Sequence, residues 1–422
     1  MNENLFKPMK RFLTPFLFIL SAILNAQDLN YVKIVIDTLT SPGMHGRGYV
    51  NDGDKIASEF IAAEFQKAGL ESFNINYFQS FGMPINTFPD SIHVFYAGRE
   101  LAPGKEFVVA SNSPAVQGKF TLVKLMQDST RNVLDDLKKS GANLSDKVVI
   151  TDFGSKDMKQ ISELNAAGYI FLTDKISWHV SNGFEVQNYF TIDLLRELYV
   201  DTVTQMILDF QNKFIKNYRT RNVIGYIKGR KHPEKYFIFS AHYDHLGQMG
   251  QRAYFPGAND NASGTAMLLD LVKFYSKPEN QPEMSMVFMA FSAEEAGLLG
   301  SSYYVMHPLF PLDKIEFLVN LDMVGSGSEG IKVVNGTVFE KDFKKLQKIN
   351  DKNNYLSKVS KRGEAANSDH YPFYYKGVPS FFIYTLGPEC KEYHNVYDTP
   401  ANVPFTKYND LFKLITNFAN DF

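Results

Sequence analysis

The chain has 422 residues, an apolar content of 44% and a formal net charge of −2. This length favours one large domain with an insertion, and the apolar content is enough for a sizeable core. The small net charge gives no sign of a nucleic-acid partner or of binding to an anionic membrane surface. The only cysteine, Cys390, excludes an intramolecular disulfide and a cysteine-rich zinc module.

The first 26 residues have the pattern of a secretory signal peptide. Lys7, Lys10 and Arg11 precede an apolar stretch at 12–24, and Ala26 lies at a plausible cleavage site. The apolar stretch is too short to span a bilayer. We therefore expect an exported protein, periplasmic or extracellular, without a permanent membrane anchor; a buried N-terminal helix is the alternative.

The pattern that follows indicates a larger domain interrupted by a smaller one. Residues 51–70 have helical periodicity, and residues 73–80 alternate like a strand. From residue 84 to 217 the sequence is rich in prolines and short strands and has no dense group of ligand-type residues. We predict a smaller mixed β/α domain at 84–217, inserted into a larger domain made of 27–83 and 218–422.

From residue 222 onward, apolar strands alternate with helices. The expected strands are 222–229, 236–241, 284–291, 316–323 and 379–385, and the expected helices are 262–276, 297–306, 340–350 and a C-terminal helix after Thr406. This alternation predicts an α/β fold whose central sheet is mostly parallel and covered by helices on both faces. In such sheets functional groups gather at the carboxyl ends of the strands.

Residues of the types that bind metals follow these strands. They are His242, Asp244 and His245 in AHYDHLG, Asp260 in GANDNASG, Glu294 and Glu295 in AEEAGLLGS, Asp322 in NLDMVG and His394 in YHNVYDT. Imidazole and carboxylate are the ligands of zinc sites that keep a position for water. Two neighbouring zinc ions need a bridging carboxylate, and an unligated neighbour must move the proton. The adjacent Glu294 and Glu295 allow one residue to bind metal while the other faces the substrate.

Other motifs carry little weight. The segment GSGSEG at 325–330 has the spacing of a dinucleotide-binding loop, but the strand-like IKVVNG follows it instead of a helix. The chain contains no HExxH helix and no GxSxG elbow.

Taken together, the five segments above resemble the co-catalytic di-zinc aminopeptidase family, which includes bacterial leucyl aminopeptidases, vacuolar aminopeptidase Y and glutamate carboxypeptidase II. The resemblance covers 222–398, and SPGMHGRG at 41–48 resembles the family's N-terminal segment. Residues 84–217 resemble the protease-associated domain of some members. The resemblance implies the zinc exopeptidase fold and hydrolysis of peptide bonds by a water that bridges two zinc ions. An aminopeptidase acting on peptides is the activity we expect.

The resemblance also implies a role for each residue. His242 and Asp322 would bind one zinc, Glu295 and His394 the other, with Asp260 as the bridge. Glu294 would be the general base, Asp244 the carboxylate behind His242, and Tyr393 a hydrogen-bond donor to the oxyanion. The Asp260–Asn261 peptide is expected to be cis.

Glu294 and Tyr393 have alternative interpretations, and the resemblance assigns no ligand role to His245 or Asn367. Glu294 could be a solvated acid at a helix start. Tyr393 could simply pack, and His245 is expected to be a surface or supporting group rather than a ligand. Asn367, in the loop NSDH, stands where some aminopeptidases carry an arginine.

Two other functions are compatible with the same scaffold. A glutaminyl cyclase-like acyl transferase would use a single zinc, so metal content separates it from a peptidase. A transferrin-receptor-like binding protein would keep the fold without the metals, yet here no ligand position is lost. The sequence predicts no particular oligomeric state.

Overall fold

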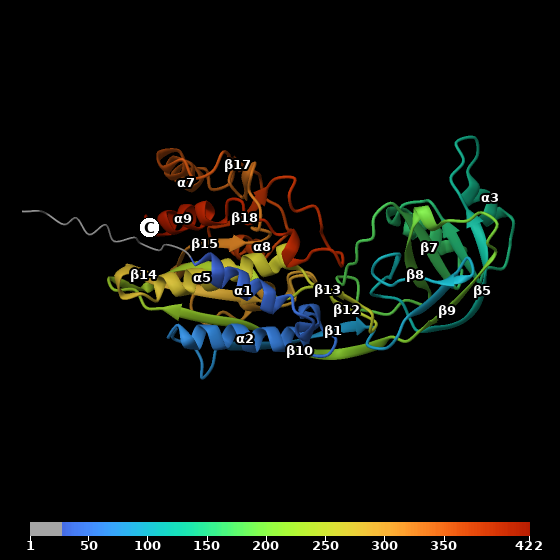
Figure 1. The fold of residues 1–422 in the computed structure, drawn as a ribbon, viewed down its shortest axis with the longest axis horizontal. Helices are drawn as coiled ribbons and strands as arrows, with labels where there is room; N and C mark the ends of the chain where they lie inside the picture. The colour runs from blue at the N-terminus through green and yellow to red at the C-terminus, as the bar shows by residue number, and fades with distance from the viewer. Residues whose placement is uncertain (1–27) are drawn as a thin grey trace, which may run out of the picture.

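The computed structural model describes residues 28–422, so the predicted signal peptide lies outside the described residues. Two eight-stranded sheets, each with its own helices, form two lobes at opposite ends of the molecule (Figure 1). Within residues 28–422, no helix combines the length and the apolar character needed to cross a membrane.

The first sheet carries the predicted strand ends. In spatial order its strands are β1 (Phe78–Thr87), β10 (Lys213–Ile227), β14 (Met284–Phe291), β11 (His232–His242), β15 (Ile315–Leu321), β18 (Ser380–Leu386), β16 (Gly330–Val334) and β17 (Val359–Lys361). The pairs β14–β11, β11–β15, β15–β18 and β16–β17 are parallel, and the other pairs are antiparallel. The α/β prediction is confirmed. The sheet is mixed because β1 and β10 form a long antiparallel ribbon at one edge and β16 runs against β18.

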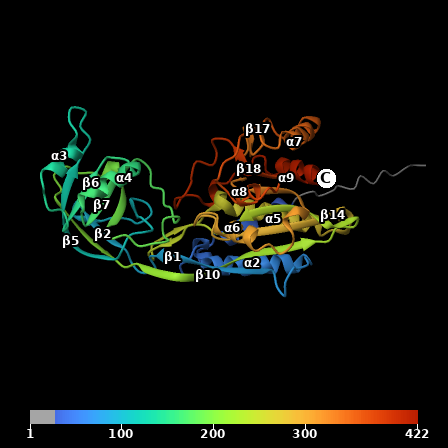
Figure 2. The same ribbon diagram turned by 180° about the vertical axis from the view of Figure 1, so that it is seen from behind.

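Helices cover both faces of this sheet. One face packs against α1 (Leu29–Leu39), α2 (Gly53–Lys67), α5 (Gly264–Tyr275), α7 (Glu340–Asn353) and α9 (Tyr408–Ala419), and the other against α6 (Leu299–Met306) and α8 (His370–Tyr375). Figure 1 shows α1, and Figure 2, from behind, shows α6. Successive side chains of β11 point to opposite faces of the sheet and pack into different hydrophobic cores. Phe237 and Phe239 pack into the core on the first face, and Ile238 packs into the core on the second. Every residue of β14 is buried, as a central strand requires.

The second sheet lies between β1 and β10 in the chain. In spatial order its strands are β3 (Arg99–Glu100), β2 (His93–Tyr96), β9 (Gln205–Phe210), β5 (Val116–Leu125), β6 (Lys147–Thr151), β7 (Gly168–Thr173), β8 (Phe190–Leu195) and β4 (Phe107–Val109). Helices α3 (Val133–Lys139) and α4 (Met158–Ile161) accompany them. This arrangement is compatible with the predicted insertion, whose exact boundaries stay a prediction.

The strand predicted at 73–80 begins only at Phe78. Phe73 instead stacks on Tyr226 of β10, with the ring centroids 4.4 Å apart. The apolar alternation before Phe78 therefore reflects aromatic packing of a loop, which the period of the sequence alone does not distinguish from a strand.

Candidate metal centre

Asp260 lies between two histidines that come from distant parts of the chain. It lies in the segment Ala258–Ser263, just before α5, and its own backbone is not helical, with φ −107° and ψ 100°. Its Oδ1 is 3.4 Å from Nε2 of His242, and its Oδ2 is 3.1 Å from Nε2 of His394. The Asp260–Asn261 peptide is cis, as expected. The two carboxylate oxygens thus face different imidazoles, which is the arrangement that a bridging ligand needs.

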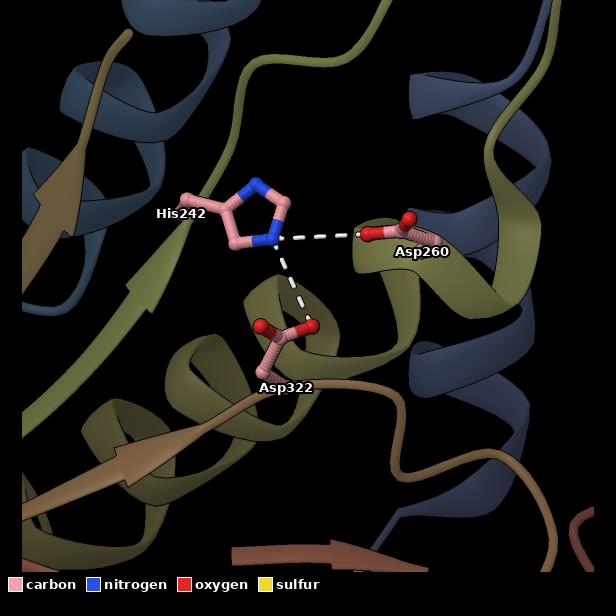
Figure 3. A group of neighbouring side chains, drawn as sticks. All are labelled: His242, Asp260 and Asp322. Carbon is pink, nitrogen blue, oxygen red and sulfur yellow. Dashed lines mark ion pairs between the residues drawn. The ribbon is translucent and has the colours of Figure 1, made fainter. Parts of the chain in front are cut away.

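The first cluster consists of His242, Asp260 and Asp322 (Figure 3). His242 ends β11, and Asp322 directly follows β15. Because these strands are parallel neighbours, their carboxyl ends bring the side chains together, and Nε2 of His242 lies 3.4 Å from Oδ1 of Asp322. The other oxygen, Oδ2 of Asp322, accepts a 2.8 Å hydrogen bond from Ser368.

The second cluster contains Glu295 and His394. Nε2 of His394 lies 3.1 Å from Oε2 of Glu295, so it faces Glu295 and Asp260 at equal distances. Oε1 of Glu295 lies 2.7 Å from Nδ1 of His245. His245 is fully buried, so its surface alternative is wrong, and it contacts a predicted ligand directly. Donor atoms of His245, Asp260 and Glu295 lie within 4.8 Å of one another.

The electrostatics of the two clusters favour a cation. Burial alone would lower the pKa of His394, but the neighbouring Glu295 and Asp260 raise it to about 11. Burial likewise opposes a charged His242, yet the carboxylates around it hold its pKa well above the usual value. Burial opposes ionisation of Asp260, but its contacts with the two histidines lower its pKa well below the usual value. The carboxylates around both imidazoles therefore stabilise positive charge at this site, and a bound metal ion would supply the same positive charge.

Two buried atoms support the fit of a metal. Oδ1 of Asp322 and Nε2 of His245 have no hydrogen-bond partner among residues 28–422. Buried polar atoms without partners are rare and costly. The unpartnered oxygen of Asp322 points at His242 inside the first cluster. Imidazole nitrogen and carboxylate oxygen are ligand types that zinc takes.

The backbone around the site adopts uncommon conformations. Ala293, Met323 and His394 have φ values of 59°, 55° and 53°, in the left-handed region. Such residues cost about 1–3 kcal/mol each and persist only where the surroundings hold them. Each one is, or directly adjoins, a predicted site residue, which supports a functional role for this region.

Glu294 lies in the turn before α6, so the alternative of a helix-start acid does not describe it. A carboxylate oxygen of Glu294 lies within 4.8 Å of donor atoms of both His242 and Glu295. Burial raises its pKa well above the usual value; the charge of His242 opposes this rise, while the neighbouring Glu295 adds to it. Glu294 is thus a half-buried carboxyl group beside both clusters with a raised pKa.

Asp244 contacts His242 through its backbone and also supports the two glutamates through its carboxylate. The nearest acceptor for Nδ1 of His242 is the backbone carbonyl of Asp244 at 3.1 Å, while its carboxylate oxygen is 3.9 Å away. The carboxylate instead accepts the backbone N–H groups of Glu294 and Glu295 at 3.2 and 3.3 Å. It also accepts a 3.1 Å hydrogen bond from Tyr49. Asp244 therefore aligns the pair of glutamates, and its backbone orients His242.

Tyr393 is 45% exposed beside the second cluster. Its ring stacks on His394, with centroids 3.8 Å apart and planes inclined by 16°. Burial and the carboxylates of Asp260 and Glu295 raise its pKa, so its phenol keeps its proton at neutral pH. Stacking alone is the packing alternative; an exposed, protonated phenol is also what a donor to substrate needs. Asn367 is exposed, whereas its neighbour Ser368 is buried against Asp322.

Three supporting residues were not predicted from the sequence. Arg47 is buried and donates to carbonyls of Leu39, Tyr243, Pro256 and Gly257 at 2.6–3.0 Å. Asp398 accepts the backbone N–H groups of Asn259 and Asp260 at 2.9 and 3.0 Å. Both lie in segments that carry the resemblance, SPGMHGRG and YHNVYDT, which was the available signal. The third, His179, contacts His394 from the second sheet, and no sequence signal marks it.

Known proteins resemble this chain in sequence and in fold. The family described as Peptidase family M28 matches residues 222–419. Aminopeptidase YwaD of Bacillus subtilis (strain 168) is 34% identical over 201 residues, which cover 45% of this chain and 41% of that protein. A glutamate carboxypeptidase 2 homologue of Caenorhabditis briggsae is 28% identical over 230 residues, covering 47% of this chain and 29% of that protein. The chain thus spans less than half the length of these curated relatives.

A solved structure extends the likeness to nearly the whole chain. The structure of BSAP, a zinc aminopeptidase from Bacillus subtilis, matches with a TM-score of 0.72 at 21% identity, and covers 93% of this chain and 94% of that chain. At this identity the match establishes the fold, and the predicted fold class is confirmed.

Proposed function

We propose that residues 222–419, which match the model of peptidase family M28, form a domain of that family, and that this protein is an exported zinc-dependent exopeptidase, most simply an aminopeptidase. One observation carries the proposal. Asp260 turns one carboxylate oxygen to His242 and the other to His394, at 3.4 and 3.1 Å. A single buried carboxylate that faces two imidazoles in this way supports a pair of metal ions rather than one.

The ligand assignment follows the two clusters. His242 and Asp322 would hold one zinc ion, Glu295 and His394 the other, and Asp260 would contact both. When bound, the two ions would supply the Lewis acidity that activates a bridging water and polarises a scissile carbonyl. His245 and Asp244 would support this set through Glu295 and through the backbone of the glutamate pair.

Glu294 is the residue we assign to proton transfer. Burial raises its pKa, which makes the carboxylate a stronger base than an exposed glutamate. It would take a proton from the attacking water and return it to the amine of the leaving group. Tyr393, whose phenol is protonated and partly exposed, would donate to the oxygen on which negative charge develops.

The substrate class follows from the family and from the charge of the chain. Peptidase relatives imply a peptide substrate, and the net charge of −2 gives no support for nucleic acid. Export rests on the predicted signal peptide at 1–26. We keep the division into 27–83 with 218–422 and an inserted, protease-associated-like 84–217 as part of the proposal.

A panel of aminoacyl-arylamides, with and without chelator, tests the activity. We expect hydrolysis of substrates with a free amino terminus, loss of activity in chelator and recovery on adding zinc, because the mechanism uses no protein nucleophile. N-acetylated versions of the same substrates are the matched control and should not be cleaved. Full turnover in chelator, or equal cleavage of the acetylated substrates, contradicts the proposal. Cyclisation of amino-terminal glutamine without arylamide hydrolysis would favour the glutaminyl cyclase alternative.

A further inference from the structure

A loop of the second sheet reaches into the metal centre of the first. Residues 174–189 connect β7 to β8. The backbone N–H of Trp178 donates to the carbonyl of His394 at 2.8 Å, and the ammonium of Lys175 donates to the carbonyl of Lys391 at 2.8 Å. The loop therefore holds the backbone of the segment that presents His394.

The side chain of His179, in the same loop, contacts the imidazole of His394. The Nδ1 atoms of the two rings are 3.0 Å apart. The other nitrogen of His394, Nε2, faces Asp260 and Glu295 at 3.1 Å. If Nε2 presents its lone pair to a metal, the ring proton must lie on Nδ1, and this N–H needs an acceptor. Nδ1 of His179 is placed to be that acceptor.

The tautomer that this role demands of His179 is compatible with its surroundings. As an acceptor, its Nδ1 carries no proton, so the proton lies on Nε2. That atom lies 3.3 Å from Oγ of Ser177, which can accept it. The hydrogen bonds then run in one direction, from His394 to His179 to Ser177.

The two metal-facing histidines differ in the source of this support. Nδ1 of His242 finds the carbonyl of Asp244 within its own strand end, at 3.1 Å. His394 does not lie at a strand end, and its backbone is in the left-handed region with φ 53°. Its support comes from the part of the chain predicted to be an insertion.

We propose that His179 is a positioning residue that fixes the tautomer and orientation of His394 for metal binding. The inference rests on the proposed role of His394 as a metal ligand. It gives residues 84–217 a direct part in building the metal centre, beyond that of a lid or a substrate platform.

Three variants separate this role from simple tethering of the loop. His179→Phe keeps a planar ring but removes the acceptor, and His179→Asn offers an oxygen close to the position of Nδ1. Lys175→Met removes the contacts with Lys391 and Glu392 and leaves the imidazole pair intact. The measurements are the dissociation constants for zinc, from competition with a chromogenic chelator, and the visible spectrum of each cobalt-substituted protein.

We expect His179→Phe to weaken the binding of one zinc ion by about 10–100-fold and to alter the cobalt spectrum, as loss of a partner of a ligand histidine does. His179→Asn should recover most of the affinity, and Lys175→Met should resemble the wild type. His179 is exposed, so the variants should unfold at the same temperature as the wild type when all are kept in chelator.

The inference is overturned if His179→Phe retains wild-type affinity and spectrum, if His179→Asn is as weak as His179→Phe, or if Lys175→Met loses as much affinity. His394→Ala separates this failure from failure of the proposed function. If His394→Ala keeps the full zinc content, His394 is not a ligand and the proposed site itself is wrong. If it loses zinc while His179→Phe does not, only the positioning role fails.

Discussion

Replacing Glu294 by glutamine removes a carboxylate that lies beside both clusters and that the ligand assignment leaves free. Its oxygen lies within 4.8 Å of donor atoms of His242 and Glu295, yet the closest ion pairs of His242 and His394 are with Asp260, Asp322 and Glu295. Glutamine keeps the size and shape of the side chain but cannot accept a proton. We therefore expect the zinc content to stay at the wild-type level while kcat falls.

The size of the fall follows from the role. A positioned general base contributes about 10²–10⁴ in rate, so kcat should fall by that factor. This corresponds to about 3–5 kcal/mol in the activation barrier. Because the loss is in proton transfer rather than in binding, KM should change much less than kcat.

Glu295→Gln is the matched control, since it makes the same chemical change one residue along the chain. Glu295 contacts His394 at 3.1 Å and His245 at 2.7 Å, so its loss should release at least one zinc ion together with the activity. The assay is kcat on an aminoacyl-arylamide and zinc content by atomic emission, on the same protein samples. Loss of zinc from Glu294→Gln with full retention in Glu295→Gln would show that the assignment of base and ligand is reversed. Normal rates in both variants would mean that this centre is not an active site.

Three further predictions follow from the same structure. The pKa of His394 is raised to about 11, so zinc must displace a proton from this imidazole at neutral pH. The apparent dissociation constant for zinc should therefore fall by about tenfold per pH unit from pH 6 to 8. Calorimetry in buffers of different ionisation enthalpy measures the released protons, and a dissociation constant that does not depend on pH contradicts this prediction. Arg47→Met leaves several buried carbonyls without a donor and should lower the free energy of unfolding, measured by urea titration, by at least about 2–3 kcal/mol. Arg99 is exposed, so Arg99→Met should change the free energy of unfolding by less than about 0.5 kcal/mol. Equal effects of the two variants would refute the structural role of Arg47. Removing residues 1–26 should leave a soluble, active enzyme, and an insoluble product beside a well-folded full-length chain would show that this segment is structural.

The sequence predicted the parts of the centre that follow from strand ends. His242 and Asp322 were expected at strand ends of one sheet edge, and the structure places those ends on neighbouring parallel strands. Residue types then indicated the chemistry, because imidazole and carboxylate at one sheet edge are what a zinc site requires. The roles of individual residues came from the resemblance and remain proposals.

The supporting contacts could not be read in this way. His179 comes from the loop between β7 and β8, far along the chain from His394, and no periodicity links a loop residue to a site built by another sheet. The use of Asp244 was also hidden. The sequence suggested that the Asp244 carboxylate contacts the imidazole of His242, from which it lies 3.9 Å, but gave no sign of its hydrogen bonds with the backbone of Glu294 and Glu295. The strand predicted at 73–80 was misplaced because Phe73 packs as a loop residue on Tyr226.

The number of zinc ions per chain, measured in the purified wild-type protein and in Asp260→Asn, tests the central claim most directly. The claim is that Asp260 joins two metal ions, because its oxygens face His242 and His394 separately. Asparagine loses the charge that offsets the repulsion between two dications, so the count should be two in the wild type and one or none in Asp260→Asn. A wild-type count near one, or a count of two that survives in Asp260→Asn, would contradict the claim.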